Sequence, residues 1–75
     1  MPTLVRLGNI KIQMFADDHN PPHFHVVTPD HEALVSLASH VVLRGAIRAS
    51  DLRTALAWAN ENAELLAREW SRLND

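Results

Sequence analysis

The residues with the clearest chemical potential lie in one short run, residues 17–25, which reads DDHNPPHFH. The run combines three imidazoles, two carboxylates and two consecutive prolines. His23 and His25 are two residues apart, a spacing that points both rings toward the same side of a strand. Such a group is compatible with a metal centre, a proton-transfer site or a polar loop that enters a sheet.

The first hypothesis is a metal centre. His23 and His25 would provide two nitrogen ligands, and His19 or Asp17 would complete a three-ligand site with one position open for water. A divalent ion such as zinc suits this donor set. The spacing H-x3-H-x-H is much less specific than paired C-x-x-C motifs. The predicted metal ligands are His19, His23, His25 and Asp17.

The second hypothesis is acid–base catalysis. Histidine changes its charge near neutral pH, so neighbouring imidazoles can divide the roles of general acid and general base. Metal-independent cleavage of a phosphodiester is a reaction of this kind, with a cation that stabilises the charged transition state. The predicted catalytic residues are His19, His23 and His25, with Asp18 as the group that orients an imidazole.

A third interpretation gives the run no chemistry of its own. Asp17 or Asp18 would cap the turn, and the prolines would fix the corner of the chain. The imidazoles would then hydrogen-bond to the backbone or to a partner. Spacing alone does not favour either site hypothesis over this interpretation.

The side chains of the run are positioned by the strands around it. Alternating apolar and polar residues, bounded by turn residues, predict strands over residues 4–16, 23–28, 32–38 and 41–44. Phe24 and Val26 should face the core, because burying imidazoles costs free energy unless they are hydrogen-bonded. His23 and His25 should then lie side by side on an open face, roughly 6–7 Å apart.

The same alternation predicts the rest of that open face. Ile10, Ile12 and Met14 should face the core, which leaves three neighbouring side chains on the open side of the strand. The expected substrate-binding residues are Lys11, Gln13 and Phe15, together with Asn20.

The sequence after residue 50 has helical periodicity. An apolar stripe follows one helix face through Leu52, Leu56, Ala59, Ala63, Leu66, Trp70 and Leu73. It predicts one long helix over residues 50–73, with a kink or a second helix as the alternative at Asn60-Glu61-Asn62. The expected fold is α+β, a single domain over residues 1–75. A small antiparallel sheet of three to four strands would carry the long C-terminal helix on one face.

Composition limits the remaining choices. A chain of 75 residues has a small core, and this one has no cysteine to cross-link it. A partner is therefore expected, and a second copy of the chain would supply the missing buried area. Trp58 and Leu65 lie off the apolar stripe and are the predicted partner interface, unless the segment Leu4-Val5 or a sheet edge covers them. Without an apolar span or signal peptide, a cytoplasmic location without membrane contact is expected.

The sequence M-F-x-x-D-H-N-P-P-H-F-H-V, from Met14 to Val26, resembles a family of small bacterial and archaeal proteins catalogued as domain of unknown function 4160. The likeness extends through residues 32–35 and into A-W-A and E-L-L-A-R-E-W, and covers nearly the whole chain. It departs where SDLRTA replaces a more basic segment. The resemblance implies a stand-alone domain, often encoded beside a second small protein in a toxin–antitoxin-like pair, so the product of an adjacent gene is the alternative partner to a second copy.

Three functional classes follow from these observations. The first is a toxin–antitoxin-associated protein with a histidine-rich working surface, as a toxin that acts on RNA. The second is a non-catalytic module that masks a protein partner in the manner of an antitoxin. The third is a structural domain stabilised by a metal.

Overall fold

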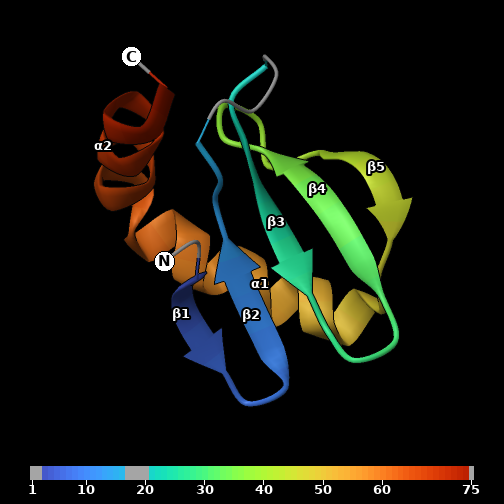
Figure 1. Cartoon of the computed structure of the whole chain (residues 1–75). Coiled ribbons are helices and arrows are strands. Elements are labelled where there is room, and N and C mark those ends of the chain that lie inside the picture. Colours follow the sequence, from blue (N-terminus) through green and yellow to red (C-terminus); the bar gives the residue numbers. More distant parts are fainter. Residues whose placement is uncertain (1–2, 17–20, 75) are drawn as a thin grey trace.

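The computed structural model describes residues 3–16 and 21–74 of the chain. Four residues of the predicted site, Asp17, Asp18, His19 and Asn20, lie outside the described residues. Five strands precede two helices in the described chain (Figure 1). The elements are β1 (Thr3–Leu7), β2 (Ile10–Gln13), β3 (His23–Val27), β4 (Glu32–Ser36), β5 (Val42–Ala46), α1 (Ala49–Glu61) and α2 (Ala63–Asn74).

The strands form one antiparallel sheet in the order β1-β2-β3-β4-β5, which confirms the predicted α+β class. The predicted number of three to four strands is wrong, because residues 4–16 contain a hairpin instead of one strand. Gly8 and Asn9 form its two-residue loop, and Gly8 has a φ of 62°, which glycine adopts at little cost. The other three predicted strands agree with β3, β4 and β5 to within two residues at each end.

The single helix predicted over residues 50–73 is also wrong, because two helices meet at Asn62. Asn62 has a φ of −122° and a ψ of 31°, outside the helical range. Its side-chain Nδ2 donates a hydrogen bond to the carbonyl of Trp58 at 2.9 Å. An asparagine side chain that bonds nearby backbone competes with helical continuation. The two-helix alternative is therefore the correct one.

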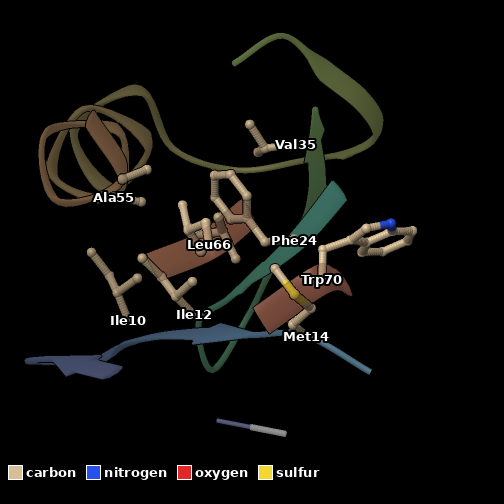
Figure 2. Packing of buried hydrophobic residues seen from close by; sticks show 10 residues of the cluster. Ile10, Ile12, Met14, Phe24, Val35, Ala55, Leu66 and Trp70 are labelled. Carbon is tan, nitrogen blue, oxygen red and sulfur yellow. The ribbon is translucent and has the colours of Figure 1, made fainter. Parts of the chain in front are cut away.

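The hydrophobic core lies between the helices and one face of the sheet, which we call the inner face. In Figure 1, α1 crosses behind the strands on that side. Figure 2 shows side chains from β2, β3 and β4 converging with side chains from both helices. The buried cluster consists of Ile10, Ile12, Met14, Phe24, Val26, Val35, Ala55, Ala59, Leu66 and Trp70.

This cluster confirms the predicted strand alternation, since Ile10, Ile12, Met14, Phe24 and Val26 are all buried. In the structure the helical stripe is interrupted at the break and resumes in α2 with the buried Leu66 and Trp70. Of its central members, Ala59 belongs to α1 and is buried, whereas Ala63 begins α2 and is exposed. Across residues 3–16 and 21–74, neither helix has the length and apolar character needed to cross a bilayer.

Candidate functional site

The side of the sheet opposite the inner face carries most of the described residues of the predicted site. We call it the outer face. One row across four strands consists of Gln13, His25, Leu34 and Arg44. A second row consists of Arg6, Lys11, Val27, Glu32 and Ala46. The structure thus brings the predicted residues Lys11, Gln13 and His25 to one surface.

Phe15 lies just beyond β2 and completes this surface. Its ring meets the ring of His25 edge-on, with centroids 4.7 Å apart and planes at 88°. The side chain is 37% exposed, although a phenylalanine is favourably buried. An aromatic ring is therefore available to a ligand beside His25, on the side of the sheet that α1 does not cover.

His25 is paired with a carboxylate. Its Nδ1 lies 3.0 Å from Oε2 of Glu32, which sits diagonally across on β4. The side chain of His25 is 13% exposed and that of Glu32 is 54% exposed. An ionised carboxylate only accepts hydrogen bonds, so Nδ1 carries the hydrogen. The bond to Glu32 and the contact with Phe15 together orient the His25 ring on the outer face.

His23 is in a different environment from His25, although their ring centroids are only 5.2 Å apart. It is 4% exposed, and its ring lies 5.4 Å from that of Trp70 on α2. Its Nδ1 donates to the carbonyl of Pro21 at 2.9 Å. The expectation that His23 faces solvent is therefore wrong. The helix break lets α2 bring Trp70 against the start of β3. The hydrogen bond to the Pro21 carbonyl offsets part of the free-energy cost of burying the imidazole.

Only two of the four predicted metal ligands, His23 and His25, belong to the described residues. Among the described residues, no group of three or more histidine, aspartate or glutamate side chains is arranged to hold an ion. His23 and His25 are close together, but the predicted ligands His19 and Asp17 lie outside the described residues. The same holds for the catalytic candidate Asp18 and the substrate-binding candidate Asn20. The metal site and the full catalytic set remain predictions.

The outer face has an excess of positive charge. Its described rows contain Arg6, Lys11 and Arg44, three of the seven lysines and arginines of the chain. They contain one of the nine acidic residues, Glu32. Within residues 3–16 and 21–74, none of these three cations has a carboxylate partner. The helices, in contrast, carry more acidic than basic residues: Asp51, Glu61, Glu64 and Glu69 against Arg53, Arg68 and Arg72.

Sequence reasoning missed four residues of this region: Arg6, Glu32, Arg44 and Trp70. The alternation of residues 32–38 predicts that Glu32 points away from the core. It does not predict the contact with His25, because alternation within one strand does not give the register between two strands. Arg6 was missed because the hairpin was read as a single strand. The contact between Trp70 and His23 depends on the break at Asn62.

The predicted partner interface is less open than expected. Trp58 is partly buried and packs against the core cluster, as do Leu4 and Val5. Leu65 is also partly buried. Among the described residues, the exposed large hydrophobic side chains are Phe15, Val41 and Leu43. The interface at Trp58 and Leu65 stays a prediction.

Comparison with known families supports the resemblance found in the sequence. Residues 9–71 match the family described as domain of unknown function (DUF4160). Comparisons with curated proteins and with solved structures give no match. The matched range begins just before β2 and ends within α2, so it includes the core, His23, His25 and Glu32.

Proposed function

The chain belongs to the DUF4160 family, and from this premise we propose that it is a toxin–antitoxin-associated protein that acts on single-stranded RNA through its outer face. The charge distribution carries this proposal. Arg6, Lys11 and Arg44 stand on a face with one carboxylate, whereas the chain as a whole has a net charge of −2. Cations gathered on one surface attract phosphates even in a protein that is acidic overall.

The exposed aromatic ring favours a single strand over a duplex. Unpaired bases stack on aromatic side chains, and open sheets with helices behind them are a common platform for this contact. Phe15 is 37% exposed and adjoins His25. A base stacked on Phe15 would place its sugar and phosphate on the part of the outer face that carries Lys11 on β2 and Arg44 on β5.

A hydrogen-bond acceptor on the same face favours RNA over DNA. Gln13 uses its Nε2 to donate to Thr3 Oγ1 at 3.1 Å, which leaves Oε1 to accept. The 2′-hydroxyl group of RNA is a donor that DNA lacks.

A charge-reversal experiment tests the proposal. The variant Lys11→Glu/Arg44→Glu is compared with Arg53→Glu/Arg68→Glu, which changes the net charge equally but places the new charges on the helices. Fluorescence anisotropy with labelled single-stranded RNA should show a loss of affinity of roughly tenfold or more in the first variant only, because its cations contact phosphate. Equal losses in both variants, or no RNA binding by the wild-type chain, would contradict the proposal. A DNA strand of the same sequence should bind more weakly.

The toxin role needs a cellular measurement. Induced expression of the wild-type chain should slow growth and reduce RNA integrity, and the Lys11→Glu/Arg44→Glu variant should do neither. Co-expression of the adjacent gene product should restore growth. Normal growth with intact RNA during wild-type expression would count against a toxin that acts on RNA.

The exposed edge of the sheet supports a second candidate function, the protein-binding module. Leu43 on edge strand β5 is 45% exposed, and Val41, which directly precedes this strand, is 56% exposed. Long exposed apolar edges are normally protected, because their unpaired backbone groups recruit further strands. We propose a second copy of this chain as the occupant, since two identical edges pair antiparallel about a two-fold axis.

The two proposed interfaces of this second candidate can be separated by matched substitutions. Leu43→Lys should convert a dimer to a monomer in light scattering if β5 forms the interface. Leu65→Lys should do so if the helical surface at Trp58 and Leu65 forms it. If light scattering shows that the wild-type chain is a monomer at high concentration, the homodimer hypothesis is excluded.

A further inference from the structure

A hollow at one end of the outer face lies between two hairpin turns, away from His25 and Phe15. One turn is the Gly8-Asn9 loop, and the other follows β3 at residues 28–31. The hollow has a volume of about 230 Å³, and both Arg6 and Lys11 line it. This volume is below the usual range of drug-sized sites, roughly 300–1,000 Å³, and suits a small group.

The charges around the hollow are unbalanced. Arg6 and Lys11 are direct cross-strand partners in the sheet. Like charges placed directly opposite each other destabilise a pair of strands. No acidic side chain lines the hollow, and neither cation has a carboxylate partner within the described residues. By comparison, Arg72 on α2 lies 2.7 Å from the carboxylate of Glu69. A bound anion would relieve the repulsion that the fold leaves uncompensated.

The walls of the hollow are held in place by local hydrogen bonds. Thr28 Oγ1 accepts from the backbone N–H of His31 at 3.1 Å, and the backbone N–H of Thr28 donates to the carbonyl of His31 at 2.8 Å. These bonds fix the second turn. The first is fixed by the positive φ of Gly8 in a two-residue loop. Two fixed turns give the cations a defined site and reduce the entropy lost on binding.

We propose that Arg6 and Lys11 bind a phosphate group in this hollow. Val27 also lines it and lies two residues from His25 along β3, roughly 6–7 Å away. An RNA strand held here by one phosphate would extend along the outer face toward His25. This placement of RNA rests on the proposed function, whereas the binding of free phosphate does not.

Titration with inorganic phosphate, followed by 1H–15N NMR, tests the site itself. Saturable shifts are expected at the amides of Gly8, Asn9, Lys11 and Thr28, and chloride at equal ionic strength should not produce them. The variant Arg6→Gln/Lys11→Gln should weaken phosphate binding by roughly tenfold or more, because it removes both cations. Arg53→Gln, on the exposed side of α1, is the matched control and should bind as the wild type does. Absent shifts, or equal shifts in the double variant, would overturn the site.

RNA oligonucleotides with a 5′-phosphate or a 5′-hydroxyl identify the source of the phosphate. If Arg6→Gln weakens only the phosphorylated strand, the hollow takes a terminal phosphate; if it weakens both equally, it takes a backbone phosphate. If it weakens neither strand, RNA does not use the hollow. Phosphate binding without RNA binding would leave the site and remove the proposed function. RNA binding without phosphate shifts would remove the phosphate site in the hollow and leave the proposed function.

Discussion

The two faces of the sheet differ although the same strands build both. Phe24 on the inner face is fully buried, whereas Phe15 on the outer face is 37% exposed. The inner face is covered by helices (Figure 1) and filled by apolar side chains. The outer face holds Arg6, Lys11 and Arg44, which have no carboxylate partner among the described residues. The inner face therefore holds the fold together, and the outer face is the surface for which we propose RNA binding.

The largest expected effect separates the two phenylalanines. Phe24→Ala should destabilise the protein by about 3–5 kcal/mol, because it opens a cavity in the core. A chain of this size has little more stability than that, so this variant should be largely unfolded. Phe15→Ala should cost less than about 1 kcal/mol and should weaken RNA binding instead. Urea unfolding, with Phe24→Leu as a milder variant, measures both. Equal costs at the two positions would refute the distinction between the faces.

The two glycines provide the next comparison. Gly45 has a φ of 84°, and a Cβ there would lie 2.3 Å from the carbonyl oxygen of Glu32. Gly8 has a φ of 62°, but a Cβ would meet nothing within 4 Å. Gly8→Ala should therefore cost about 1–2 kcal/mol from backbone strain alone, and Gly45→Ala distinctly more, because β4 and β5 must also separate. Thermal unfolding ranks the two, and a smaller loss at Gly45 would contradict the close approach of these strands.

Alanine substitution of the two histidines should also destabilise the protein unequally, with the larger cost at His23, but the difference should be smaller than for the phenylalanines. His23→Ala removes a buried ring and the donor of the Pro21 carbonyl, which should cost about 1–3 kcal/mol. His25→Ala removes a hydrogen bond to a carboxylate that is itself exposed, which should cost less than about 1 kcal/mol. RNA affinity should fall more in His25→Ala than in His23→Leu, which retains an apolar side chain against Trp70. Greater destabilisation at His25 would mean that the outer face, too, supports the fold.

The smallest expected effect is a change in the salt dependence of RNA binding. Lys11→Gln should leave the free energy of unfolding within about 0.5 kcal/mol of the wild type, because Lys11 has no carboxylate partner among the described residues. It should lower the slope of log affinity for RNA against log salt by about one, the loss of one phosphate contact. An unchanged slope would show that Lys11 does not contact phosphate.

The sequence predicted the faces of the strands better than their connections. Alternation alone correctly buried Ile12, Phe24 and Val26, since one residue of slip would expose a whole strand. It did not reveal that Glu32 meets His25, because register comes from pairing between strands and not from the pattern within one. The burial of His23 likewise depends on Trp70, whose position follows from a helix break. A continuous apolar stripe masked that break.

The most direct test of the account is to map bound RNA on the protein by NMR. When single-stranded RNA is added to 15N-labelled protein, the amides of Lys11, Gln13, Phe15, His25 and Arg44 should shift together and saturate at one Kd. The amides along the exposed side of α1, including Arg53, should not move. Shifts confined to the helices, or no shifts at RNA concentrations that saturate anisotropy, would contradict the assignment of RNA binding to the outer face.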